Sequence, residues 1–268
     1  MSTHGASLPG RTPPGQDRWA ATSHGLIVLD GATAIDPALP PAEEYVDALL
    51  AALCRRVDSA EDLGGLIADA IATVTNELAL APGDAPSSTV AVLRWTADTA
   101  ETAVLGDSTI MLGTSAGDTI RLCDDRLAAI AAPLRRAYRE RLRDGHGYDD
   151  VHRKLLVDIQ RDERRARNTE GGYWIAEADS HAGHHADVRR YPLTDLEWAV
   201  LTTDGAQRVI DHLDISWLNV AAKSDRELAD LLRDLHQWEA EHDPDGQQLP
   251  RAKRHDDKTL AAWTPDQR

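Results

Sequence analysis

The order of the predicted elements indicates an α+β protein in which helices pack outside two antiparallel sheets. Strands come first, then two helices, a block of strands, two more helices, and finally strands with one further helix. Because strands and helices do not alternate regularly, a doubly wound parallel sheet is disfavoured. Ala97 and Asp98 separate two apolar, β-branched runs and predict a hairpin turn, so we expect neighbouring strands to be antiparallel.

The first half of the chain carries clear signals for one strand and two helices. Residues 1–14 are rich in Gly and Pro and predict a loose N-terminal arm. An apolar run over 24–29 predicts a buried strand. Pro40 and Pro41, followed by two glutamates, are typical of a helix start, because proline tolerates the first turn and acids suit its positive end. A stripe of apolar residues over 63–78 predicts the second helix.

The second half adds a strand block, an arginine-rich helical region and a final strand. The residues of 125–167 are helical in character, with a break at 144–147 that predicts two helices. A loop with His181, His184 and His185 follows. The remaining expected elements are strands at 88–95, 101–105, 109–112, 173–175, 197–202 and 259–263 and a helix at 224–241. We find no internal boundary, so residues 1–268 are expected to form a single domain.

Composition and charge disfavour nucleic acids and membranes as binding partners. The chain has 268 residues and a formal net charge of -16 at pH 7, a field that repels nucleic acid and anionic membrane surfaces. No apolar run is long enough to span a bilayer, and the N-terminus lacks the apolar core of a signal peptide. We therefore expect a cytoplasmic protein that binds neither nucleic acid nor membrane. The sequence leaves its oligomeric state open.

Four aspartates lie where a strand begins or ends. Asp30 follows the strand over 24–29, Asp204 follows the strand over 197–202, and Asp256 precedes the last strand. Asp17 stands shortly before the first buried strand. Carboxylates fixed at the tips of buried strands cannot spread apart, and hard divalent cations with oxygen ligands are the usual means of neutralising them. The sequence therefore predicts a metal site that the fold gathers from distant segments.

These aspartates belong to motifs that occur in a characteristic order. The motifs are Gln16-Asp17, Asp30-Gly31, Ser87-Ser88-Thr89, Gly106-Asp107-Ser108, Thr203-Asp204-Gly205 and Asp256-Asp257-Lys258-Thr259. In order, spacing and strand context they resemble the motifs of the bacterial-type metal-dependent protein phosphatase 2C (PPM) family. Each motif alone is weak, because Asp-Gly pairs are common in turns. The resemblance covers nearly the whole chain.

The resemblance implies a fold, a cofactor and an activity. The fold would be a four-layer αββα sandwich. The cofactor would be two Mn²⁺ or Mg²⁺ ions: Asp30 would bridge both, the Gly31 carbonyl would bind one, and Asp204 and Asp256 would bind the other. Asp17 would hold metal-bound water, and Asp107 would lie near a third ion. Arg208 stands where some members have an aspartate of that third site, so the sequence gives it little support.

The expected activity is hydrolysis of phosphoserine and phosphothreonine in a partner protein by a water that two metal ions activate. Arg11 lies near the position of the family's phosphate-clamping arginine, and a guanidinium suits two phosphate oxygens. We assign it this role together with the catalytic aspartates Asp30, Asp204 and Asp256. The chain departs from the family at 32–34, where Ala-Thr-Ala follows Asp30-Gly31, and at Gln16, which removes a charge.

These departures keep two alternatives open. The first is a weakened phosphatase-like module that binds phosphoproteins or has a regulatory role. The second is a two-metal phosphatase that acts on a small phosphorylated metabolite or a peptide intermediate.

Two histidine features can each be explained either by a functional role or by an ordinary structural one. The cluster at His181, His184 and His185 is dense enough for zinc or nickel but matches no closed metal motif. His255 could donate a proton or orient a carboxylate, although a surface histidine is the simpler interpretation.

Overall fold

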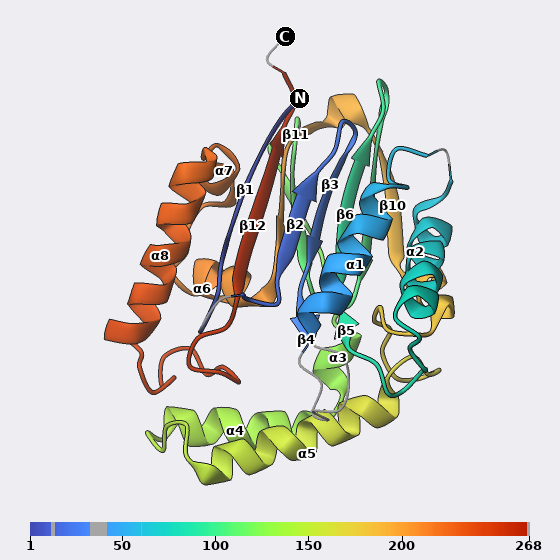
Figure 1. Ribbon diagram of the computed structural model, residues 1–268. Coiled ribbons are helices and arrows are strands. Elements are labelled where there is room, and N and C mark those ends of the chain that lie inside the picture. Colours follow the sequence, from blue (N-terminus) through green and yellow to red (C-terminus); the bar gives the residue numbers. More distant parts are fainter. Residues whose placement is uncertain (12–13, 33–41, 60, 267–268) are drawn as a thin grey trace.

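Two antiparallel sheets stand face to face in the computed structural model, which describes residues 1–11, 14–32, 42–59 and 61–266 (Figure 1). The first sheet has the order β1-β12-β11-β8-β9 and the second the order β10-β7-β6-β3-β2. The strands of the first are β1 (Ser2–Leu8), β12 (Lys258–Thr264), β11 (Leu196–Thr202), β8 (Thr109–Thr114) and β9 (Thr119–Leu122). Those of the second are β10 (Asp187–Pro192), β7 (Thr99–Leu105), β6 (Val90–Trp95), β3 (Gly25–Leu29) and β2 (Arg18–Ala21). A short pair, β4 (Gly31–Ala32) and β5 (Ser87–Ser88), extends beyond them.

Helices cover the outer face of each sheet. On the second sheet lie α1 (Ala42–Cys54) and α2 (Leu63–Glu77), and on the first lie α6 (Asp204–His212), α7 (Trp217–Ala221) and α8 (Asp225–Glu241). Three apolar clusters fill the layers between them. Side chains such as Leu26, Leu201 and Trp263 pack between the sheets, and two further clusters join each sheet to its helices. The α+β class and the four-layer αββα arrangement predicted from the sequence are confirmed.

A helical hairpin lies across one end of the sandwich, at the lower edge of Figure 1. It consists of α4 (Ala132–Arg143) and α5 (Asp150–Ala166), preceded by the short α3 (Arg126–Ala129). The predicted break at 144–147 is present, and Gly145 and Gly147 adopt positive φ there. The hairpin has a small apolar cluster of its own around Tyr138, Leu142 and Ile159. This α4–α5 hairpin is therefore a satellite of the sandwich rather than part of its layers.

Several sequence predictions need correction. Residues 2–8 are not a loose arm, because they form β1, which pairs with β12 along its whole length from Ser2 to Leu8. The expected strand at 173–175 is absent from the described strands; this segment makes only isolated bridges, between Arg167 and Tyr173 and between Ser88 and Ala176. The expected histidine loop is a 3₁₀ helix over Ser180–His185.

Two other expectations concern the helices. Pro40 and Pro41, the predicted helix start, lie outside the described residues, and α1 is described from Ala42 onward. In the part of the chain that the structure describes, no helix combines the length and the apolar character needed to cross a bilayer.

Candidate metal centre

The strand register brings the motif aspartates to one end of the sandwich. Asp17 precedes β2 and Asp30 follows β3, and these strands pair Arg18 with Leu29. Asp204 follows β11 and Asp256 lies two residues before β12, and these strands pair Thr202 with Leu260. Asp107 lies in the turn after β7, whose last residue, Leu105, pairs with Val90 at the start of β6. Antiparallel pairing thus places five carboxylates from distant segments at the same edge.

Burial and the neighbouring negative charges both raise the pKa values of these carboxylates. Burial raises the pKa of Asp30 well above its usual value, and the negative charges of Asp17, Asp204, Asp256 and Asp107 raise it further. Burial likewise raises the pKa of Asp107 to about 7, with Asp204 adding to the shift. The sequence predicted that the fold would gather these residues, and the structure brings all five together. Their roles as metal ligands stay a prediction.

Asp17 provides the most specific sign that a cation belongs here. Its side chain is buried, and one oxygen, Oδ2, accepts a hydrogen bond of 2.7 Å from Thr203 Oγ1. The other oxygen, Oδ1, is buried with no hydrogen-bond partner among the described residues. Burial raises the pKa of this carboxyl to about 8, and although the Thr203 hydrogen bond lowers it, Asp257 and Asp256 raise it. A buried oxygen without a donor costs free energy, which a bound cation would recover. The donor set therefore fits a hard divalent ion.

Close backbone approach explains two of the motif glycines. A Cβ at Gly205 would lie 2.1 Å from the Asp257 carbonyl oxygen, so the start of α6 can meet the segment before β12 only with glycine there. A Cβ at Gly31 would lie 2.7 Å from the Gln16 carbonyl oxygen, which accepts a hydrogen bond from the Gly31 N–H at 3.2 Å. The two glycines hold Asp204 against Asp256, and Asp30 against Asp17.

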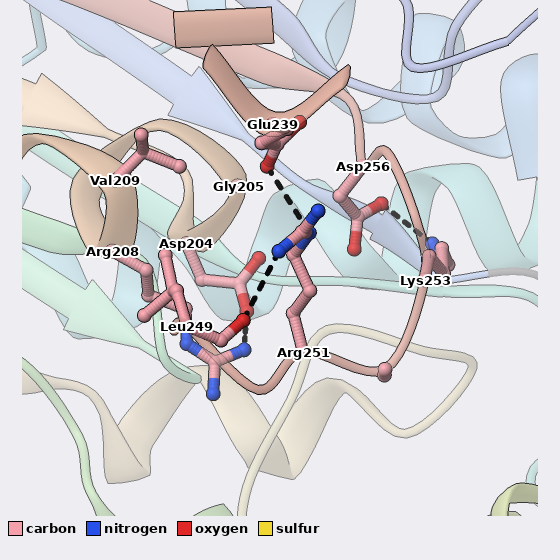
Figure 2. Close-up of a pocket in the computed structure, with 10 residues that line it drawn as sticks. Asp204, Gly205, Arg208, Val209, Glu239, Leu249, Arg251, Lys253 and Asp256 are labelled. Atoms are coloured by element: carbon pink, nitrogen blue, oxygen red, sulfur yellow. Dashed lines mark hydrogen bonds and ion pairs between the residues drawn. The ribbon is translucent and has the colours of Figure 1, made fainter. Parts of the chain in front are cut away.

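Cations from the protein already contact two of the aspartates. Lys253 Nζ lies 2.7 Å from Asp256 Oδ1, and Arg208 Nη1 lies 3.4 Å from Asp204 Oδ2. Both aspartates line a narrow pocket that also contains Arg251 and has about 20 Å³ of open space, room for one water or one metal ion. Figure 2 shows the two aspartates on the wall of this pocket, each beside its own cation. Neither Lys253 nor Arg251 lies in a recognisable motif, so neither was predicted from the sequence as part of the site.

Asp257 contacts the segment that leads to Asp17 and Arg11 belongs to it, and the two residues differ in their contacts. Asp257 is a structural residue: its Oδ1 accepts the Gly10 N–H at 2.7 Å, and its Oδ2 accepts the Gln16 N–H. It thereby fastens the segment that carries Asp17. Arg11 is exposed and makes no ion pair or hydrogen bond with any described residue. Its neighbour Gly10 packs against the backbone of Asp256, where a Cβ would lie 2.5 Å from the carbonyl carbon. Thr33 and Ala34, part of the departure after Asp30-Gly31, lie outside the described residues.

Among the residues that the structure describes, the histidines form no metal-ligand cluster with the aspartates. His181 and His185 face each other with their Nε2 atoms 3.2 Å apart, and His185 stacks on Trp174. Elsewhere, His255 Nδ1 donates a hydrogen bond of 3.0 Å to Glu239 Oε2, and with His236 these side chains could surround an ion. However, Lys258 Nζ lies 2.8 Å from the same Glu239 oxygen and already neutralises it. His255 therefore has a structural partner.

The comparisons with known proteins concern the fold. The sequence matches no protein-family model and no curated protein. Solved structures of bacterial phosphatases, by contrast, match over nearly the whole chain. A bacterial serine phosphatase has a TM-score of 0.57 and 13% identity, covering 98% of this chain and 96% of the other. The serine/threonine phosphatase Stp1 from Staphylococcus aureus has a TM-score of 0.55 and 14% identity, covering 100% and 96%.

A third similar structure is the PPM Ser-Thr phosphatase MsPP from Mycobacterium smegmatis in complex with cacodylate. It has a TM-score of 0.56 and 16% identity, covering 98% of this chain and 97% of the other. At such low identity the likeness establishes that the chain has the fold of these phosphatases. Its function has to be argued from the site.

Proposed function

We propose that this chain is a metal-dependent phosphatase that removes phosphate from serine or threonine in a phosphorylated protein. The observation that carries the proposal is the cluster of five carboxylates at one end of the sandwich, with the unpartnered, buried Asp17 Oδ1 among them. The fold is the one that the bacterial serine/threonine phosphatases share. We also propose a single catalytic domain over the whole chain that acts in the cytoplasm.

The residues that would hold two Mn²⁺ or Mg²⁺ ions are Asp17, Asp30, the Gly31 carbonyl, Asp204 and Asp256, with Asp107 beside them. When bound, such ions neutralise the carboxylates and activate water for attack on phosphorus. Thr203 would position one of these ligands, because its hydroxyl donates a hydrogen bond to Asp17 Oδ2.

Guanidinium groups supply the phosphate contact in this proposal. Arg251 and Arg208 line the narrow pocket with Asp204 and Asp256, and Arg11 follows Gly10, which packs against Asp256. A guanidinium can donate two parallel hydrogen bonds to phosphate oxygens. Of the three, Arg11 is the only one without a partner in the described structure, so it is free to bind an incoming phosphate.

A second candidate function has its own supporting observation. Lys253 and Arg208 already neutralise Asp256 and Asp204, and a site neutralised from within has less need of metal. A module that binds a phosphorylated partner without hydrolysing it would fit these contacts. It would bind phosphopeptide and release no phosphate whether or not metal is added.

The deciding experiment is phosphate release from a phosphothreonine peptide by wild type and Asp204→Ala, with Mn²⁺, with Mg²⁺ and with EDTA. We expect release that needs metal and that falls at least about 1,000-fold in the variant, because a lost ligand removes charge stabilisation from the transition state. Asp69 is an exposed aspartate on α2 that forms no ion pair with any residue the structure describes, so Asp69→Ala is the matched control and should behave like wild type. A small phosphomonoester assayed in parallel separates a protein phosphatase from a metabolite phosphatase. Full turnover by Asp204→Ala, or turnover that survives chelation, would refute the assignment.

A further inference from the structure

A second pocket opens beside the carboxylate cluster, and four arginines contribute to its lining. It has about 180 Å³ of space, and Asp107 and Asp204 belong to its wall. The arginines come from three different elements: Arg121 from β9, Arg135 and Arg139 from α4, and Arg208 from α6. The pocket therefore lies between the carboxylate cluster and the α4–α5 hairpin, which crosses this end of the sandwich in Figure 1.

The lining of this pocket is unusually rich in arginine for so acidic a chain. Its four guanidinium groups outnumber its three carboxylates, Asp107, Asp125 and Asp204, whereas the chain carries a formal net charge of -16. In a protein so acidic, four guanidinium groups gathered beside a proposed active site offer hydrogen-bond donors to an anion at that one place.

One of the four arginines has a free guanidinium. Arg121 lies 3.5 Å from Asp211, Arg135 pairs with Glu163, and Arg208 lies 3.4 Å from Asp204. Arg139 pairs with no carboxylate among the described residues; its guanidinium only lies over the Tyr138 ring, 5.7 Å from the centroid. Arg139 thus has its hydrogen-bond donors available for a ligand in the pocket.

We propose that this arginine-lined pocket binds an anionic group of the substrate next to the phosphoresidue that is hydrolysed. The group is an acidic side chain or a second phosphate, since both present the oxygen pair that a guanidinium binds bidentately. The inference rests on the proposed phosphatase function and adds a substrate class to it: peptides in which the target residue has an anionic neighbour. Arg139 is the residue that confers this preference.

The test compares phosphothreonine peptides of one length that differ at a flanking position, which carries Ala, Glu or phosphoserine. Each is assayed with wild type, Arg139→Ala and Arg136→Ala. Arg136 is exposed on the same helix and does not line the pocket, so it is the matched control for charge. Mass spectrometry follows loss of the threonine phosphate alone, and the Glu and phosphoserine arms distinguish the two sources of the anion.

We expect the kcat/KM of wild type to be about tenfold higher for an anionic peptide than for the Ala peptide. Arg139→Ala should reduce this ratio to about two, whatever its activity on the Ala peptide, and Arg136→Ala should keep it. A wild-type ratio of one at every flanking position overturns the proposal, as does an equal loss in both variants. Comparing ratios excludes a general loss of activity as the cause.

A further assay distinguishes refutation of the phosphatase function from refutation of the proposed anion-binding pocket. Wild type is also given p-nitrophenyl phosphate with Mn²⁺, and absence of turnover on every substrate refutes the phosphatase function. The pocket is then decided by calorimetric titration of the same peptides. Tighter binding of the Glu or phosphoserine peptide that Arg139→Ala loses supports the pocket, and equal binding of all three peptides overturns it.

Discussion

The sandwich and the α4–α5 hairpin both contribute residues to the same end of the molecule. The sandwich contributes aspartates and the hairpin contributes arginines, and the two regions differ in how much of their apolar surface is buried. The aspartates lie at the ends of strands whose apolar residues are fully buried, such as Leu29, Leu105 and Leu201. The hairpin buries few apolar residues, and its links to the rest of the molecule include polar contacts, such as His152 to the Ala252 carbonyl at 2.9 Å and Arg164 to the Gly83 carbonyl at 2.9 Å. Like charges can be held together only by a rigid frame, whereas groups that meet a substrate can be carried by a less firmly held element.

This difference predicts unequal costs for the same core substitution in the two regions. Leu201→Ala removes a buried side chain from between the sheets and should lower the free energy of unfolding by about 3 kcal/mol. Leu142→Ala makes the same change in the small cluster of the hairpin, which can open locally, and should shift the global transition by less than about 1 kcal/mol. Urea denaturation measures both, and amide hydrogen exchange should show faster exchange confined to α4 and α5 in Leu142→Ala. Equal shifts in the two variants would mean that the hairpin is a full part of the cooperative core.

The same difference explains what could be predicted from the sequence. Apolar, β-branched runs located the buried strands β3, β7 and β11, and Asp30, Asp107 and Asp204 follow the ends of these strands. β1 was missed because Ser2–Leu8 is polar and contains Gly5, so its strand character comes from pairing with β12. α6 was missed because Asp204-Gly205 is typical of a turn as well as of a helix start. Lys253 and Arg251 lie in a segment without periodicity, and Arg139 lies in the predicted helical region over 125–167. Only the tertiary fold places these cations near the site.

The crowded carboxylates should make the metal-free protein less stable as the pH rises. Asp17 and Asp107 have pKa values of about 8 and about 7 in the folded chain, against a usual value of 3.8. Between these values the folded chain binds more protons than the unfolded chain, so the free energy of unfolding falls as the pH increases from 4 to 8. Asp107→Asn should remove part of this slope and stabilise the metal-free protein at pH 8 by about 1 to 2 kcal/mol.

Thermal unfolding in EDTA at pH 5 and pH 8 measures this effect. The variant should unfold at a higher temperature than wild type at pH 8. Its advantage should be smaller at pH 5, where Asp107 is protonated in the folded chain and no longer adds to the repulsion. Asp69→Asn, on the exposed face of α2, should change neither. A wild type that is more stable in EDTA at pH 8 than at pH 5 would contradict the repulsion that the burial and mutual contacts of these groups indicate.

The smallest expected effect concerns Lys253, a cation beside one of the fixed carboxylates. Its ammonium lies 2.7 Å from Asp256, so it competes with a divalent ion for that carboxylate. Lys253→Ala should tighten Mn²⁺ binding, because it removes this competing cation. The gain should be only about three- to tenfold, because the pair is partly exposed and its attraction is screened by water. Calorimetric titration of Mn²⁺ into the metal-free protein measures this without any assay of activity. Arg254→Ala, which removes an exposed cation paired with Asp245 at 3.7 Å, should leave the affinity unchanged within about twofold. If Lys253→Ala instead weakens Mn²⁺ binding, the lysine orients Asp256 for the ion rather than competing with it, and the neutralised-module alternative loses its main support.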